Sequence, residues 1–139
     1  MSIFLFILGK LVRLMTFPAH YPDECPPGDA RDADGELFRF VRNQPPQSSD
    51  FVPVYPGNTV IDADMRCQAC GLSVLLTEVD VVAARKTCPW FKKRLVAKGR
   101  VNRDWGKTGR TGSQVPNHYT WWVASGKSPE QIFEVIEVR

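Results

Sequence analysis

The sequence predicts a single compact α+β domain in which a mixed or mainly antiparallel sheet is combined with two short helices. Three observations predict this class: strand-like alternation in ELFRFVRN at 36–43, a capped helical stretch at 77–86, and renewed alternation in FEVIEVR at 133–139. The 139 residues are typical of one domain and suffice for a hydrophobic core. The composition, 43% hydrophobic and 24% charged, is that of an ordinary globular chain.

The first fifteen residues, MSIFLFILGKLVRLM, are treated separately from the domain at 16–139. The apolar run Ile3–Leu8 is too short to span a bilayer, and its basic residues follow it, unlike those of a signal peptide. Apolar residues recur near helical spacing at Phe4, Leu8, Leu11 and Met15. We expect a terminal helix docked on the domain or a partner, or an upstream extension of a protein that begins at Met15. A membrane-surface anchor is the third alternative.

The first half of the domain is predicted to be largely extended or irregular. Residues 16–35 form a proline- and acid-rich arm, and the strand at 36–43 ends at the following NQPP. This strand places Phe38 and Phe40 on one face. Prolines restrict 48–58 to an edge-like segment and turn, whereas GLSVLL at 71–76 is a short apolar run typical of a buried strand.

The second half is predicted to contain the helices. Thr77 is a candidate N-cap for a helix over 77–86, with an apolar stripe of Val79, Val82 and Ala83. A second helix is expected to begin with Ser128 as its N-cap and Pro129 behind it. The remaining expectations are a basic strand at 92–101, a glycine-rich loop at 104–117, a strand at 118–124 and a closing strand at 133–139.

The cations are concentrated in one segment, although the net charge of the whole chain is only +3. Residues 85–110 carry ten basic side chains and one acidic, a net charge of +9, whereas residues 1–84 have a net charge of −5. Such a block predicts a nucleic acid or an acidic protein surface as partner. The alternative is a solvated surface whose cations pair with the acids of the N-terminal half. The candidate binding residues are Lys92, Arg94, Lys98, Arg100, Arg103, Lys107, Arg110, His118 and Trp122.

Two motifs near this segment bear on the same question. GKTGRTG at 106–112 is not a P-loop, because the first glycine of that motif is replaced by Val101, but Lys107 and Arg110 remain candidates for phosphate contacts. In HYTWW, alternation places His118, Thr120 and Trp122 on one face of a strand. We expect one tryptophan in the core and the other, Trp122, to be available for stacking on a base. Burial of both is the alternative.

The four cysteines are Cys25, Cys67, Cys70 and Cys88. Without a convincing secretory signal, we expect a cytoplasmic protein with reduced thiols rather than a disulfide framework. The pair in CQAC has the spacing of a zinc knuckle, and a site is possible with Cys67, Cys70, Cys25 and His20. Because a second close ligand pair is missing, no metal is favoured.

The motifs LFRFVRNQPP, CGLSV, HYTWW and IFEVIE resemble an uncharacterised family of small bacterial proteins over residues 17–139. The order of the elements is also similar to that of ADP-ribosyltransferase-like folds. That similarity implies an NAD pocket surrounded by Arg39 or Arg42, Ser73 and His118. A late acidic residue would be Glu130 or Glu134.

Three functions follow from these observations. The first is an accessory module that binds nucleic acid or an anionic protein through residues 85–110 and the adjacent aromatic residues. The second is an ADP-ribosyltransferase-like enzyme or toxin. The third is a structural subunit that joins a complex through residues 1–15. A concave pocket lined by Arg39, Ser73 and His118 would favour the second function, and a flat basic face the first.

Overall fold

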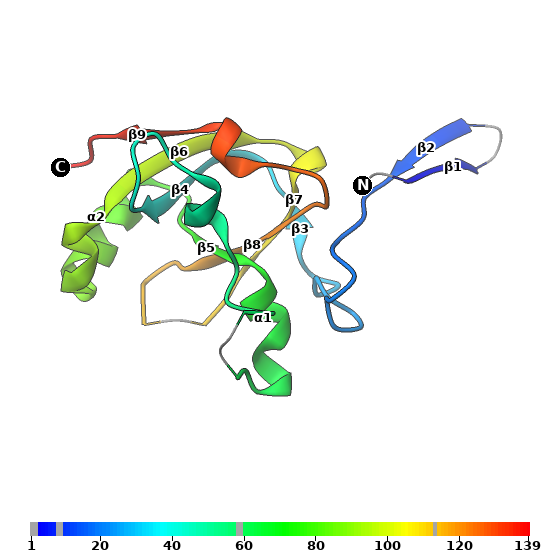
Figure 1. The fold of residues 1–139 in the computed structure, drawn as a ribbon, viewed down its shortest axis with the longest axis horizontal. Helices are drawn as coiled ribbons and strands as arrows, with labels where there is room; N and C mark the ends of the chain where they lie inside the picture. Colours follow the sequence, from blue (N-terminus) through cyan, green and yellow to red (C-terminus); the bar gives the residue numbers. More distant parts are fainter. Residues whose placement is uncertain (1–2, 8–9, 58–59, 113) are drawn as a thin grey trace.

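The structure is a computed structural model that describes residues 3–7, 10–57, 60–112 and 114–139. Its strands form two sheets and a separate hairpin, and all the strand pairs are antiparallel. One sheet has the order β4 (Gly35–Val41), β6 (Leu95–Val101), β9 (Phe133–Ile136). The other has the order β3 (Arg31–Asp32), β7 (Gly106–Arg110), β8 (Tyr119–Val123), β5 (Leu72–Val74). The two α-helices are α1 (Arg66–Cys70) and α2 (Glu78–Thr87) (Figure 1).

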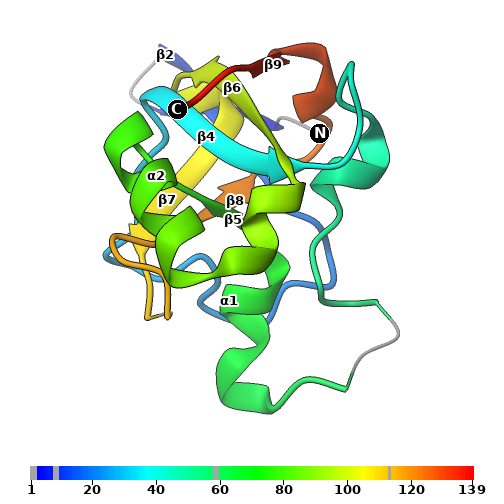
Figure 2. The same cartoon turned by 90° about the vertical axis from the view of Figure 1, so that its left-hand side faces the viewer.

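The α+β class with an antiparallel sheet is therefore confirmed. The main core lies between the two sheets, with Leu37 and Val41 of β4 facing Leu72 of β5 and Trp121 of β8. A smaller cluster packs Phe38 and its neighbours against α2. The sheets are joined where Phe38 and Leu75 exchange backbone hydrogen bonds of 2.8 and 2.9 Å. Figure 2 shows α2 beside β4 and β5, with α1 below them in the lower part of the view.

The helix α2 begins as the sequence predicts, because Oγ1 of Thr77 accepts a 3.1 Å hydrogen bond from the backbone N–H of Asp80. Its buried residues, however, are Val81 and Ala84, while Val79 is 77% exposed. The predicted apolar stripe is therefore wrong. Both sets of residues have helical spacing, and only contact with the sheet determines which face is buried.

Several other predicted elements differ. Residues 66–70, which include CQAC, form α1, a helix that the sequence analysis does not predict. The expected second helix is only the 3-10 turn Pro129–Gln131, and the expected loop at 104–117 contains β7. The glycine-rich sequence forms this strand because it pairs with β8 on one side and β3 on the other. Other 3-10 turns are Ser48–Phe51, Ala63–Met65, Pro89–Lys93 and Arg103–Trp105.

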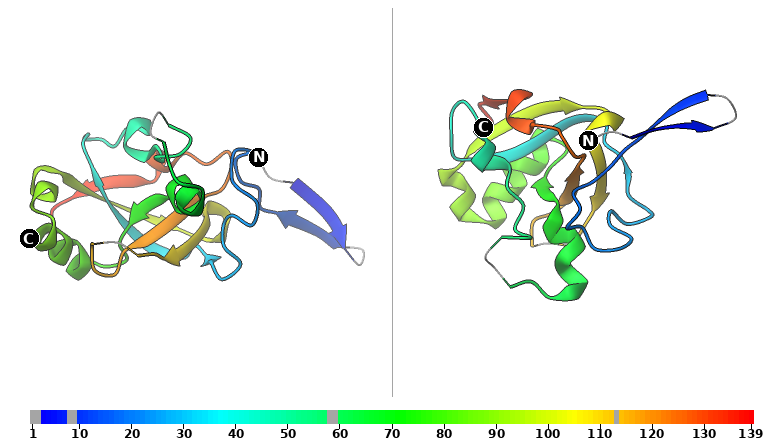
Figure 3. Two further views of the ribbon diagram at one scale, coloured as in Figure 1. Left: turned by 90° about the horizontal axis from the view of Figure 1, so that it is seen from below. Right: turned by 45° about the vertical axis from the view of Figure 1, so that its right-hand side comes forward.

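The N-terminal segment is a β-hairpin and not the docked helix that its spacing predicts. Strands β1 (Ile3–Ile7) and β2 (Lys10–Leu14) pair with each other, with Leu5 opposite Val12. Residues 1, 2, 8 and 9 of this segment lie outside the described residues. The hairpin projects away from the two sheets in both views of Figure 3. Within the described residues, no helix is long and apolar enough to cross a bilayer.

Candidate active site

Four side chains are linked by hydrogen bonds across the sheet formed by β5, β7 and β8. Ser73 on β5 is directly opposite Thr120 on β8, and His118 immediately precedes β8. Nε2 of His118 lies 2.8 Å from Oγ of Ser73, and its Nδ1 lies 2.8 Å from Oγ1 of Thr111. Oγ1 of Thr111 in turn lies 2.9 Å from Oγ1 of Thr120. The chain therefore links a serine, a histidine and a group that orients the histidine.

His118 and Ser73 differ in burial, and this difference affects proton transfer between them. His118 is only 8% exposed, whereas Ser73 is exposed. Burial lowers the pKa of His118 below its ordinary 6.5, and a backbone hydrogen bond at Thr111 opposes this only in part. His118 is therefore neutral at neutral pH. When its Nδ1 carries the proton and donates to Thr111, its Nε2 accepts from the hydroxyl of Ser73.

Arg39 supports the same strand from the neighbouring sheet. Its Nη1 donates to the backbone carbonyl of Ser73 at 2.8 Å, and its Nε donates to the backbone carbonyl of Asp50 at 2.9 Å. Burial lowers the pKa of Arg39 to about 10, and the nearby charge of Asp50 opposes that shift. The guanidinium remains charged at neutral pH and lies next to the backbone of Ser73.

The carboxylate of Asp50 is itself fixed by three donors. It accepts from the backbone N–H of Arg42 at 2.8 Å, from the backbone N–H of Gln47 at 2.9 Å and from the amide of Asn43 at 3.1 Å. Burial raises its pKa, but these hydrogen bonds outweigh burial and the net pKa is lowered. Arg42 takes part through its backbone, and its side chain is exposed.

A small cleft opens onto these groups. Its lining includes Arg39, Ser73 and His118, the three residues that the sequence groups together. The rest of the lining is apolar: Phe38, Phe40, Val74, Leu75, Phe91 and Val115. The rings of Phe40 and Phe91 are stacked, with centroids 4.3 Å apart. The cavity measures about 30 Å³, close to the share of one water molecule in liquid water.

A molecule as large as NAD would lie mostly outside this cleft. Pockets that bury a ligand of drug size measure about 300–1,000 Å³, whereas this cavity measures about 30 Å³. The Nε and Nη1 donors of Arg39 are also engaged by backbone carbonyls. The cleft can instead admit a small reactive group, such as a carbonyl, while the remainder of a substrate lies outside.

Part of the basic strand predicted at 92–101 is confirmed as β6, on which alternation places Lys98 and Arg100 on one face. Lys92 lies instead in the 3-10 turn Pro89–Lys93, because β6 begins only at Leu95. Lys107 and Arg110 lie on β7, which belongs to the other sheet. Nζ of Lys98 lies 3.1 Å from the carboxylate of Glu36, and Nζ of Lys107 lies 3.3 Å from that of Asp32. These two ion pairs are expected if the basic segment is a solvated surface whose cations pair with acids of the N-terminal half.

Of the remaining candidates, Arg94, Arg100 and Arg103 are exposed or partly exposed, and Nη2 of Arg110 donates to the side-chain carbonyl of Asn117 at 3.0 Å. Trp122 is 1% exposed, and its Nε1 donates to the carbonyl of Cys67 at 2.7 Å. Trp121 is also buried. The expectation that Trp122 stacks on a base is therefore wrong for this conformation, because α1 covers the face that alternation leaves open.

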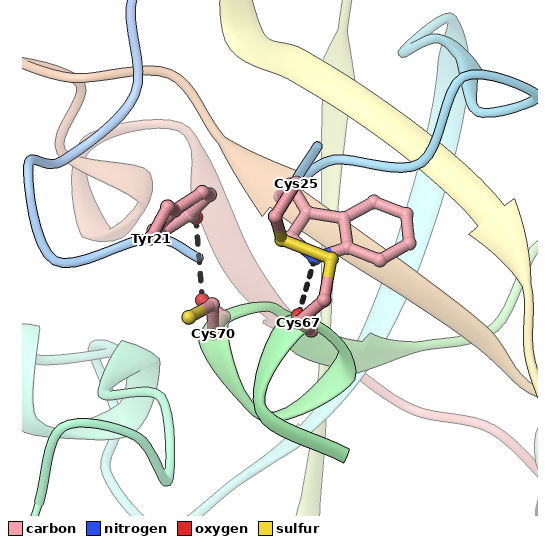
Figure 4. The surroundings of a disulfide bond; sticks show 5 residues. Tyr21, Cys25, Cys67 and Cys70 are labelled. Atoms are coloured by element: carbon pink, nitrogen blue, oxygen red, sulfur yellow. Dashed lines mark hydrogen bonds between the residues drawn. A yellow bond between two sulfur atoms is a disulfide. The ribbon is translucent and has the colours of Figure 1, made fainter. Parts of the chain in front are cut away.

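Cys25 and Cys67 form a disulfide, which corrects the expectation of reduced thiols at these positions. The bond ties the proline-rich arm to α1, while Cys70 and Cys88 are free and buried. In Figure 4 the sulfur of Cys70 points away from the disulfide, and its backbone carbonyl accepts a 3.3 Å hydrogen bond from the hydroxyl of Tyr21. The sequence predicts an irregular arm, and it brings Cys25 close to CQAC only in the possible zinc set.

The possible zinc set is incompatible with this disulfide, since Cys25 and Cys67 are bonded to each other. The ring of His20 instead packs against Tyr21 and Tyr55, with centroids 5.3 and 6.0 Å apart. Across the described part of the chain, no three His, Cys, Asp or Glu side chains lie together as a metal site.

Sequence reasoning missed three residues of the site: Asp50, Thr111 and Thr120. Thr120 shares the face of His118 by strand alternation, and this signal could have identified it. Thr111 lies in a stretch that the sequence predicts to be a loop. The role of Asp50 depends on the contact between the 3-10 turn at 48–51 and β4, which the sequence does not indicate. In comparisons with known proteins, no family model matches the chain, and no curated protein or solved structure gives a match.

Proposed function

We propose that this chain is an enzyme that transfers acyl groups through Ser73, with His118 as its general base. The supporting observation is the hydrogen bond of 2.8 Å between Nε2 of His118 and Oγ of Ser73. A serine is a weak nucleophile until an adjacent base takes its proton. Here the base is neutral, is oriented through its other ring nitrogen, and faces a hydroxyl that is open to solvent.

In this reaction, Oγ of Ser73 attacks the carbonyl carbon of an ester or a related substrate, and its proton passes to Nε2 of His118. The bond to the leaving group breaks as His118 returns that proton to the leaving oxygen, which gives an acyl-serine and an alcohol. A water molecule then gives a proton to His118 and attacks the acyl-serine. The products are a carboxylic acid and free Ser73.

The surroundings limit the substrate. The charge of Arg39 would stabilise the negative charge that develops on the carbonyl oxygen. The aromatic walls of Phe40 and Phe91 suit an apolar substituent next to the carbonyl. Because the cavity measures only about 30 Å³, we expect small esters to react faster than bulky ones.

Labelling with an alkyl fluorophosphonate tests this proposal. Attack by an activated serine forms a phosphorus–oxygen bond and releases fluoride, so mass spectrometry of peptides locates the modified residue. We expect one adduct, on Ser73. Ser73→Ala should abolish it, and His118→Gln should slow it about 10²–10⁴-fold, the usual contribution of a general base. Ser49→Ala, an exposed serine outside the cleft, is the matched control. Equal labelling of native and urea-unfolded protein at Ser73 would refute the proposal.

A second candidate function is the binding of nucleic acid or an acidic protein surface by the basic residues of 85–110. It is supported by exposed cations outside the two ion pairs, among them Lys92, Lys93 and Arg100. Binding of this kind weakens steeply with salt. Titration of single- and double-stranded DNA and RNA at about 50 mM salt, with an Arg94→Glu/Arg100→Glu variant, separates this function from the enzyme. The subunit role of residues 1–15 and a cytoplasmic location remain proposals.

A further inference from the structure

A second, larger concavity is lined in part by Thr111, the residue whose hydroxyl is hydrogen-bonded to His118. It is a groove of about 450 Å³ between the proline-rich arm and strands β7 and β8. Pro27, Asp29, Ala30 and Arg31 line one side. Residues 108–111, Tyr119 and Trp122 line the other. Its volume lies within the range of about 300–1,000 Å³ that is usual for small-molecule sites.

Two arginines line this groove from adjacent strands. Arg31 of β3 is paired with Thr108 of β7, and Arg110 lies two residues further along β7. They are therefore diagonal neighbours on one face of the sheet, a relation in which residues are about 7–8 Å apart. Both arginines therefore border the same groove from neighbouring positions.

Neither arginine is neutralised by an acid. Arg110 donates to the neutral side chain of Asn117, and no acidic side chain in the described residues forms an ion pair with Arg31 or Arg110. The neighbouring Lys107, in contrast, is paired with Asp32. Asp29 also lines the groove, so the two arginines and this acid leave a net charge of +1. Two like charges at this spacing repel each other, and an anion between them would remove that cost.

We infer that this groove binds the anionic group of a small molecule, a phosphate or a carboxylate, between Arg31 and Arg110. Guanidinium groups bind both anions through paired charge-assisted hydrogen bonds. Tyr119, which is partly exposed, gives the rest of such a ligand an apolar surface. The hydroxyl of Thr111 lies at the boundary between this groove and the candidate active site.

Pyrophosphate and citrate are suitable probes of this site, because the first carries only phosphate oxygens and the second only carboxylates. In titrations followed by backbone amide chemical shifts, we expect at least one of them to bind in the millimolar range or tighter. The shifts should be largest at residues 108–111 and around Arg31. A response to only one probe identifies the preferred anion.

Arg31→Gln and Arg110→Gln should each weaken binding about tenfold or more, the change expected on losing a charge-assisted hydrogen bond. Arg139→Gln, an exposed arginine outside both the groove and the basic segment, is the matched control and should bind as the wild type does. Ser73→Ala should also bind normally, so this test is independent of the proposed enzyme. Absence of binding by both probes, or equal loss in Arg139→Gln, would overturn the inference.

Discussion

The cleft at Ser73 and the groove at Arg110 are linked through Thr111, which lines the groove and is hydrogen-bonded to His118 of the cleft, yet they differ in almost every physical property. The cleft is small and mostly apolar, and its polar groups are hydrogen-bonded to one another. The groove is about 450 Å³ in volume and contains cations without acidic partners. The first region is organised internally, as a reactive centre requires. In the second region, the described residues leave the cations without acidic partners, so these cations are available to a ligand, as a recognition site requires.

The two regions also depend on different parts of the chain. The cleft is formed by elements of the two sheets and is supported by Arg39 and Asp50. One side of the groove is the arm, which is tied to α1 by the disulfide between Cys25 and Cys67. Perturbations of the arm should therefore affect the groove and spare the cleft, and the following predictions test this difference.

The largest effect is expected from loss of the disulfide in a Cys25→Ser/Cys67→Ser variant. The bond closes a loop with a sequence separation of 42, for which the chain-entropy estimate is about 4 kcal/mol of stability. Urea unfolding measures this loss. Pyrophosphate binding should also weaken, while Ser73 should still react with a fluorophosphonate. Reductant should reproduce the effect in the wild type and leave the variant unchanged. Loss of Ser73 reactivity in a folded variant would contradict the separation of the two regions.

Asp50→Asn should perturb the cleft and not the groove. The substitution places an amide where a carboxylate accepts two backbone N–H groups, at a cost of about 1–3 kcal/mol. Since the folded pKa of Asp50 is lowered, its contribution is complete above the ordinary value of 3.8 and is lost as pH falls through the folded pKa. Urea unfolding of the wild type should therefore show a larger loss of stability in acid than Asp50→Asn. Asp34→Asn, at an exposed acid, serves as the control.

The pH dependence of Ser73 labelling gives a smaller but more specific effect. The rate should rise with pH through an apparent pKa below 6.5, at which His118 loses its proton, and then stay constant. The stability of the fold also rises with pH in this range. The contribution of neutral His118 is complete above pH 6.5 and is lost as pH falls through the folded pKa. Thr111→Val should lower the plateau several-fold, and Thr108→Val, in the groove, should not. A profile centred above 6.5 would exclude His118 as the base.

The smallest effect is expected at the ion pair of Lys98 with Glu36. These side chains are 34% and 44% exposed, and an exposed pair contributes about 0.2–1 kcal/mol. Lys98→Gln should therefore change the free energy of unfolding by a few tenths of a kcal/mol, with no change at either region. If the basic segment binds nucleic acid, Glu36→Gln should strengthen that binding, because it frees Lys98. If nucleic-acid binding is unchanged in Glu36→Gln, Lys98 does not contribute to that binding.

The parts of the fold that the sequence predicts correctly are those with local signals. The cap at Thr77 and the alternation around Phe38 involve neighbours in the chain, and both are confirmed. Strand β7 was missed because glycines have weak strand propensity, and its pairing with β8 overrides that propensity. The disulfide joins an irregular arm to a helix of five residues, and neither element has a periodic pattern.

The same distinction between local sequence signals and tertiary contacts applies to the candidate site. Arg39, Ser73 and His118 were grouped through a resemblance, and the structure brings the three to one cleft. The NAD that this resemblance implies would lie mostly outside a cavity of about 30 Å³. The partners that position these residues, Asp50 and Thr111, come from turns and strand ends whose geometry depends on tertiary contacts.

The pairing of β5 with β8 has a consequence for how the chain is made. Strand β5 ends at Val74, yet its partner β8 is complete only at Val123. At about 5–20 residues per second, ribosomal synthesis leaves β5 without that partner for roughly 2–10 s. Ser73 is thus translated well before the strand that carries its hydrogen-bonding neighbours. The nascent chain has to keep the apolar Leu72 and Val74 from aggregating during this interval, and the candidate site can assemble only after Val123 has been synthesised.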